Sequence, residues 1–207
     1  MTITELPTSA ALDEHAWDLL FTQARTVETF TDEPVPVEAV RAVYEAVRWA
    51  PTAMNSSPLR LAVVTSAPAR ERLVAQLAPG NQAKTLAAPL TLVAAYDPSF
   101  HEHLPVLAPH GAGMREDLDA QPEVREALAR TSALLQVGYL LVGLRGAGLH
   151  VGPMTGMDAA GVDAELFAAN GWRALVVLNV GHAPAGTPGA VRPRAARLDF
   201  ADVVEVL

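Results

Sequence analysis

One polar segment, WAPTAMNSSPLR (residues 49–60), lies between a run with helical periodicity and a strand-like run. Its short hydrogen-bonding side chains and backbone amides suit the polar edge of a planar heterocyclic ligand. The same composition also occurs where asparagine and proline end a helix, so the segment alone does not choose between the two interpretations. The residues concerned are Pro51, Thr52, Ala53, Asn55, Ser56 and Ser57.

Two further segments could present groups to the same kind of ligand. Asn81 and Lys84 are three residues apart, so they would share one face of a helix that precedes a strand. Gly152, Pro153 and Gly156 predict a turn whose amides can approach a flat ligand closely. A solvated helix start and an ordinary Gly-Pro turn explain these residues equally well. The segments are GNQAKTLAAP (80–89) and GLHVGPMTGMD (148–158).

Arginines gather near the C-terminus, in the segment VRPRAARL (191–198). They are Arg192, Arg194 and Arg197, and Arg25 in QARTVETF is a further candidate. Guanidinium groups bind phosphate through paired hydrogen bonds. Because the whole chain has a formal net charge of -8, a local cluster of arginine departs from the surrounding charge and favours an anion site.

Composition bounds the class of protein. The chain has 207 residues, of which 50% are hydrophobic and 18% charged, so we expect one domain over residues 1–207. Its acidic balance argues against a broad nucleic-acid surface. The absence of cysteine excludes disulfides and thiolate metal sites and fits the reducing cytoplasm. The N-terminal residues show no signal-peptide core, and the longest apolar run, 134–144, is shorter than a membrane span, so we expect a soluble protein.

Hydrophobic periodicity predicts alternating helices and strands. Ser66 and Pro68 are typical of a helix start. This alternation favours an α/β or α+β layered fold. The expected helices cover 11–24, 36–50, 67–78 and 123–149, with a last short helix near the C-terminus, and the expected strands cover 59–66, 89–97 and 172–183.

The expected helix 123–149 is apolar on nearly all sides from Ala133 onward. Such a helix lies either at the centre of a core or at a contact between subunits. For a chain of this length we favour the contact of a dimer, with an ordinary central helix as the alternative.

Three histidines, His101, His103 and His110, occur in SFHEHLPVLAPHG. His101 and His103 would point to opposite faces of a strand and lie about 200° apart on a helix, so we predict no metal site. A loop or lid that contacts the substrate is the better interpretation, and the segment 104–122 is the one we expect to choose the substrate.

In their joint order, these segments resemble the FMN-dependent nitroreductase family, and most closely its malonic semialdehyde reductase-like subgroup, which is associated with pyrimidine degradation. The resemblance covers almost the whole chain, from ARTVETF to RPRAARL. It implies an α+β fold in which helices wrap a central, mostly antiparallel sheet. It also implies a domain-sharing homodimer that holds FMN at the interface between its subunits.

The resemblance assigns each segment a role toward FMN. Arg25 and Thr26, with Arg194 and Arg197, would hold the phosphate and ribityl chain. Asn81 and Lys84 would face the pyrimidine edge. The segment 51–55 would reach the flavin from the partner subunit, and the amides of 153–156 would face N5 and O4. Glu28 is a departure, because many members carry a basic residue there. The implied cofactor-binding residues are Arg25, Thr26, Pro51, Thr52, Ala53, Asn55, Asn81, Lys84, Pro153, Met154, Thr155, Gly156, Arg194 and Arg197.

The implied reaction has two steps: NADH or NADPH gives hydride to FMN and leaves, and an electron-poor acceptor then takes it. Malonic semialdehyde, yielding 3-hydroxypropionate, is the subgroup's acceptor, with nitroaromatics or quinones as surrogates. FMN carries the chemistry, so no catalytic side chain is expected. Nothing in the sequence selects between the two nucleotides. A reductive dehalogenase, a flavin-degrading enzyme and a non-catalytic flavin-binding or structural homodimer are the alternatives.

Overall fold

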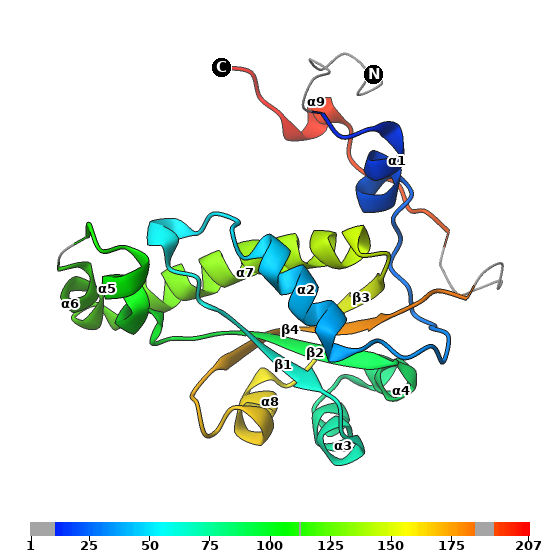
Figure 1. Ribbon diagram of the computed structural model, residues 1–207, viewed down its shortest axis with the longest axis horizontal. Helices are drawn as coiled ribbons and strands as arrows, with labels where there is room; N and C mark the ends of the chain where they lie inside the picture. Colours follow the sequence, from blue (N-terminus) through cyan, green and yellow to red (C-terminus); the bar gives the residue numbers. More distant parts are fainter. Residues whose placement is uncertain (1–10, 112, 185–192) are drawn as a thin grey trace.

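A computed structural model describes residues 11–111, 113–184 and 193–207. Its centre is a four-stranded antiparallel sheet with the strand order β1-β2-β4-β3 (Figure 1). The α+β class and the antiparallel sheet were therefore predicted correctly. The strands are β1 (Leu59–Val64), β2 (Leu90–Tyr96), β3 (His150–Met154) and β4 (Arg173–Gly181).

Helices cover both faces of the sheet, and each face has its own apolar core. Side chains alternate along a strand, so Leu92 and Leu178 join the core beneath α2 and α7, whereas Val93 and Val177 join the core beside α3 and α8. All seven residues of β2 are buried, and complete burial of a side chain such as Leu92 contributes about 1.5–3 kcal/mol. The helices concerned are α2 (Val37–Val47), α3 (Ala67–Ala75), α7 (Pro122–Gly146) and α8 (Ala159–Leu166).

The remaining helices are short. In the expected helix 11–24, α1 continues directly into a wider π-helical turn, η2, and the helix expected after Ser66 begins where the Ser66 hydroxyl accepts a hydrogen bond from the amide of Ala69. The short elements are α1 (Glu14–Trp17), η2 (Asp18–Thr22), η3 (Ala53–Asn55), α4 (Pro79–Ala87), η4 (Phe100–His103), α5 (Leu104–Leu107), α6 (Met114–Asp119) and α9 (Phe200–Val203).

The prediction of a turn at Gly152 and Pro153 was wrong, because both residues lie within β3. Among the described residues this strand is at the edge of the sheet and pairs only with β4, so the missing N–H of a proline costs no ladder hydrogen bond on the open side. The chain turns after Met154 instead. Helix α8 was not expected either, whereas α5 and α6 lie in the segment 104–122, where a loop or a helix lid was expected.

Helix α7 buries one stripe of side chains against the sheet and exposes an apolar opposite side. Ala133 and Leu140 are fully buried, whereas Leu135 is 52% and Tyr139 41% exposed. By length and composition α7 could cross a membrane. Its most apolar 18-residue stretch has a mean hydropathy of 1.4, and 39% of that stretch is buried. This is weak evidence for a span, because helices that pack on a sheet have the same composition.

Candidate functional site

Three of the segments singled out in the sequence meet at the β3 edge of the sheet: residues 25–28, 81–84 and 153–156, called here the three-segment cluster. A Cβ atom added to Gly152 would lie 2.6 Å from the carbonyl oxygen of Val27, so the first segment passes directly against β3. The side-chain amide of Asn81 donates to the carbonyl of Gly156 over 2.9 Å. The ammonium of Lys84 lies 3.8 Å from the Glu28 carboxylate.

Backbone hydrogen bonds fix the turn that follows β3. The amide of Ala78 donates to the Gly156 carbonyl over 3.0 Å, and the amide of Asp158 donates to the Gln76 carbonyl over 2.8 Å. Within the described part of the chain, the N–H groups of Thr155 and Gly156 donate no hydrogen bond, and both residues are exposed. The turn therefore presents two backbone donors on a rigid support.

The arginines of the C-terminal segment are placed differently from one another. Arg194 donates to the carbonyl of Thr22, which is three residues before Arg25 and four before the exposed Thr26. Arg197 donates only to the neighbouring carbonyls of Ala195 and Ala196 within the described residues. Arg192 lies outside the described residues.

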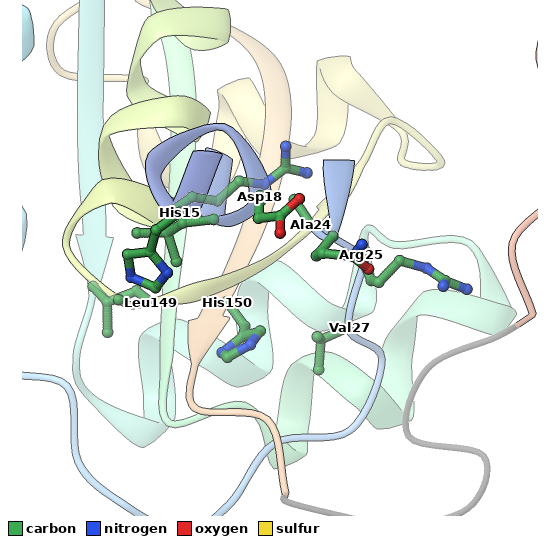
Figure 2. Close-up of a pocket in the computed structure, with 11 residues that line it drawn as sticks. His15, Asp18, Ala24, Arg25, Val27, Leu149 and His150 are labelled. Atoms are coloured by element: carbon green, nitrogen blue, oxygen red, sulfur yellow. The ribbon is translucent and has the colours of Figure 1, made fainter. Parts of the chain in front are cut away.

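A hollow of about 310 Å³ lies between the N-terminal helical segment and β3, with Arg25 on its wall. Figure 2 shows His15 and His150 on one side of it, with the Arg25 side chain extending away from them. Burial, and then the nearby His182, lowers the pKa of His150. Burial also lowers the pKa of Arg145, whose guanidinium donates to the Leu20 carbonyl over 3.0 Å.

The segment 51–57, called here the polar loop, has a strained backbone. Met54, Asn55 and Ser57 have φ values of 56°, 52° and 42°, in the left-handed region that non-glycine residues rarely adopt. The Asn55 side chain donates to the Leu107 carbonyl over 2.8 Å, which attaches the loop to α5. The hydroxyl of Ser56 is buried and has no hydrogen-bond partner among the described residues.

The polar loop and the three-segment cluster do not meet within one chain. The loop leads into β1 and the cluster borders β3, and these are opposite edges of the sheet, three strand spacings or about 14 Å apart. Leu59 pairs with Tyr96, whereas Gly152 aligns through Asn179 with Thr91, which adds about 16 Å along the strands. In Figure 1 the cyan turn of the loop lies beside α5, and α4 lies toward the other end of the sheet.

Two polar contacts that sequence reasoning missed hold the strand residues directly after the polar loop. The buried side chain of Gln136 on α7 accepts a hydrogen bond from the Leu59 amide over 2.9 Å. Tyr96, opposite Leu59, donates to Glu126 over 2.6 Å, and its burial together with this carboxylate raises its pKa to about 12. A polar residue within an apolar helix was the available signal for Gln136.

The histidine-rich segment packs onto α7. His101 is buried, with Nε2 located 3.2 Å from Arg125 Nη1 and 3.4 Å from Asp119 Oδ1. His103 is exposed on the same short helix. Among the residues described, no group of three or more side chains is arranged to hold a metal ion. His101 therefore connects η4 and α6 to the long helix.

Residues 22–182 match the nitroreductase family. A protein of Leptothrix cholodnii named "Putative NADH dehydrogenase/NAD(P)H nitroreductase" is 47% identical over 197 residues, which cover 95% of this chain and 98% of that protein. A protein of Streptomyces griseus with the same name is 48% identical over 198 residues, with the same two coverages.

Solved structures of low sequence identity share the fold. A nitroreductase family protein from Streptococcus pneumoniae superimposes with a TM-score of 0.78 at 20% identity, covering 91% of this chain and 98% of its own. A protein of Exiguobacterium sibiricum named "putative nitroreductase", solved in complex with FMN, gives a TM-score of 0.75 at 17% identity, covering 97% of this chain and 100% of its own. With the family match and the two relatives above, these findings lead to one conclusion: the chain belongs to the nitroreductase family.

Proposed function

We propose that the protein is an FMN-dependent oxidoreductase that takes hydride from NADH or NADPH. The observation that carries this proposal is the three-segment cluster, where the Asn81 to Gly156 hydrogen bond joins the turn with the two available amides to the helix that carries Lys84. Relatives named as NAD(P)H nitroreductases support the electron donor. A fold neighbour in complex with FMN supports the cofactor.

The residues of this chain fit FMN in donor type and in charge. The amides of Thr155 and Gly156 are suited to donate hydrogen bonds to the N5 and O4 side of the ring, with Pro153 and Met154 leading into that turn. Lys84 and Asn81 supply donors for the pyrimidine edge. Arg25, Thr26 and Arg194 supply cationic and hydroxyl groups for the phosphate. Arg197 joins this set only if it leaves its present carbonyl partners.

FMN supplies the hydride-accepting and hydride-donating ring, and the protein supplies its orientation and electrostatic environment. The Gly156 carbonyl accepts hydrogen bonds from Ala78 and Asn81, so α4 would hold the turn after β3 in place and its two amides would orient the ring. A cation at the pyrimidine edge stabilises negative charge on the reduced ring. No protein nucleophile is required for this chemistry.

The same proposal makes the functional unit a homodimer in which the polar loop of one subunit completes the site of the other. The separation of the loop from the three-segment cluster within one chain supports this arrangement. An apolar groove of about 860 Å³ between α2 and α7, lined by residues such as Ala46, Tyr139 and Gly143, supplies a surface that a second subunit would cover. Pro51, Thr52, Ala53 and Asn55 are then the residues contributed across the interface.

Malonic semialdehyde is the acceptor that we propose, with nitroaromatics and quinones as surrogates. The basis of this proposal is that the segments follow one another in the order found in the malonic semialdehyde reductase-like subgroup. Helices α5 and α6 are the elements that we expect to select the acceptor. The proposed enzyme is one domain over residues 1–207, and it acts in the cytoplasm on a small molecule, without a nucleic-acid or membrane partner. The lack of cysteine fits a reducing compartment.

The first test is a visible absorption spectrum of the purified protein before and after NADH or NADPH is added without oxygen. Flavin bands that bleach with either nucleotide would support the donor half-reaction. Parallel steady-state plots at several fixed nucleotide concentrations would support two successive steps, and intersecting lines would reject them. A colourless protein that takes up no added FMN would overturn the proposal, and product analysis without oxygen separates aldehyde reduction from dehalogenation or flavin cleavage.

A further inference from the structure

The ion pair between Glu28 and Lys84 joins two parts of the three-segment cluster that are 56 positions apart in sequence. Glu28 is the last residue of the segment that passes β3, and Lys84 lies on α4, one turn after Asn81. The Asn81 side chain is attached to Gly156, so the Lys84 side of α4 has a fixed position relative to the turn after β3. The carboxylate and the ammonium therefore meet at the edge of the proposed flavin site.

The distance between the charges defines what kind of contact this is. The Lys84 Nζ and Glu28 Oε1 atoms are 3.8 Å apart, which is longer than the roughly 2.7–2.9 Å of a charge-assisted hydrogen bond. The ammonium is attracted by the carboxylate, but its N–H donors are not committed to it. The side chains of Lys84 and Glu28 are 24% and 35% exposed, so solvent screens the attraction between them less than it would at a fully exposed pair.

We propose that Glu28 is a positioning residue that holds Lys84 and offsets part of its positive charge where the pyrimidine edge of FMN binds. This inference rests on the proposed function. Hydride transfer moves two electrons and one proton from NAD(P)H to the ring, which leaves NAD(P)⁺ and gives the ring one added negative charge. A lone lysine beside the ring would favour this reduced form over the oxidised form.

With Glu28 in place, that preference is reduced, because the ring meets a nearly neutral pair in place of a lone cation. The bound cofactor then has a lower midpoint potential than it would have beside Lys84 alone. A flavin of lower potential passes hydride more favourably to a weakly oxidising acceptor. This property suits an aldehyde, which is harder to reduce than a quinone or a nitroaromatic compound.

The test compares Glu28→Gln with the wild-type protein, both loaded with FMN. The midpoint potential is measured by equilibration with reference dyes, and the dissociation constant of oxidised FMN by fluorescence titration. We expect Glu28→Gln to favour reduced over oxidised FMN by about tenfold, which raises the midpoint potential by about 30 mV for a two-electron couple. Lys84→Gln should shift the potential in the opposite direction.

Two further variants separate this role from simpler explanations. Glu33→Gln removes one negative charge from an exposed side chain on the same stretch of chain, where it pairs with His182 at 3.6 Å, and it should leave the potential unchanged. In a Lys84→Gln background, Glu28→Gln should change the preference for reduced over oxidised FMN by less than about twofold, because Glu28 acts through Lys84.

An unchanged midpoint potential in Glu28→Gln would overturn the inference, even if FMN binds more weakly. Equal loss of affinity for the two redox forms would mean that Glu28 only supports the local structure. Retention of the full shift in the Lys84→Gln background would also overturn it, because Lys84 would not then carry the effect. A wild-type protein that binds no FMN would instead reject the proposed function on which the inference rests.

Discussion

The three-segment cluster and the polar loop are built in different ways. Segments from distant parts of the chain meet in the cluster, where backbone contacts and the Asn81 to Gly156 hydrogen bond fix them. The polar loop is one continuous segment, held by left-handed backbone at three residues and attached to α5 through Asn55. The cluster is complete within one chain, whereas the loop is a shaped surface at the opposite edge of the sheet. One chain therefore contains two parts of the proposed site that only a dimer would bring together.

The division of the proposed site between two subunits is tested by a variant that prevents the dimer while leaving each region intact. Ala46 is exposed on α2 and lines the apolar groove against α7. In Ala46→Glu a carboxylate would have to be buried without a partner at the contact, which costs several kcal/mol. We expect a monomer that binds FMN at least about a hundredfold more weakly, since each 1.4 kcal/mol is about tenfold. Analytical ultracentrifugation and FMN titration measure the two effects.

A matched control is Ala160→Glu, which places the same charge on an exposed residue in the first turn of α8, where an acidic side chain is favourable. It should remain dimeric and retain FMN. A monomeric Ala46→Glu variant with wild-type affinity for FMN would show that the cluster is sufficient by itself, and the division of the site between subunits would be wrong.

The cluster itself is tested at Gly152. Its missing Cβ is what allows Val27 to pass against β3, because a Cβ would lie 2.6 Å from the Val27 carbonyl oxygen. In Gly152→Ala either the strand or the 25–28 segment must move, and overpacking of this kind costs about 1–3 kcal/mol of unfolding free energy. The affinity for FMN should fall together with the unfolding free energy. Urea denaturation and FMN titration provide the measurements.

Gly80→Ala is the corresponding control, since a Cβ at Gly80, on α4 close to Asn81, would meet nothing within 4 Å. This variant should keep its affinity for FMN and lose no stability, because alanine is preferred over glycine in a helix. Equal behaviour of the two glycine variants would mean that the contact at Val27 does not hold the cluster together.

The polar loop is tested at Asn55, where two substitutions separate backbone shape from side-chain contact. Asn55→Ala loses the hydrogen bond to Leu107 and also places alanine at a φ of 52°, for a total of about 1–2 kcal/mol. Asn55→Gly loses the same hydrogen bond but accepts the backbone conformation, so its stability should be higher than that of the alanine variant. Both should weaken FMN binding about tenfold if the side chain contacts the flavin. Unchanged affinity in both would remove Asn55 from the site.

The difference between the two regions also explains what the sequence could predict. The polar loop was recognisable because its polar residues follow one another in the sequence. In addition, Asn55 is a residue type that tolerates left-handed backbone. The positive φ at Met54 had no signal, since methionine shows no such preference. Strands β1, β2 and β4 were predictable from their continuous apolar runs. Edge strand β3 was not, because Gly152 and Pro153 have turn propensity and only pairing with β4 makes them a strand.

The cluster could be predicted only segment by segment. The three-residue spacing of Asn81 and Lys84 correctly indicated a shared helical face, which α4 provides. The contact of Lys84 with Glu28 has no local signal, because it depends on how two distant segments pack against β3. The resemblance to nitroreductases pointed to Glu28 as a departure, and the structure identifies the residue that faces it.

The smallest expected effect is a pH dependence at the β3 end of the cluster. The Ala183 amide donates to His150 Nδ1 over 3.2 Å, so the neutral ring is the form that fits, and burial together with His182 lowers the pKa of His150. A base whose pKa is lower in the folded state stabilises the fold at high pH and loses that contribution as the pH falls below its unfolded value of about 6.5. We expect the melting temperature to fall more steeply between pH 7 and pH 5 in the wild-type protein than in His150→Gln. His110→Gln, which changes an exposed loop histidine, should keep the wild-type slope, and identical slopes in all three proteins would show that the His150 ring does not stabilise this end of β3.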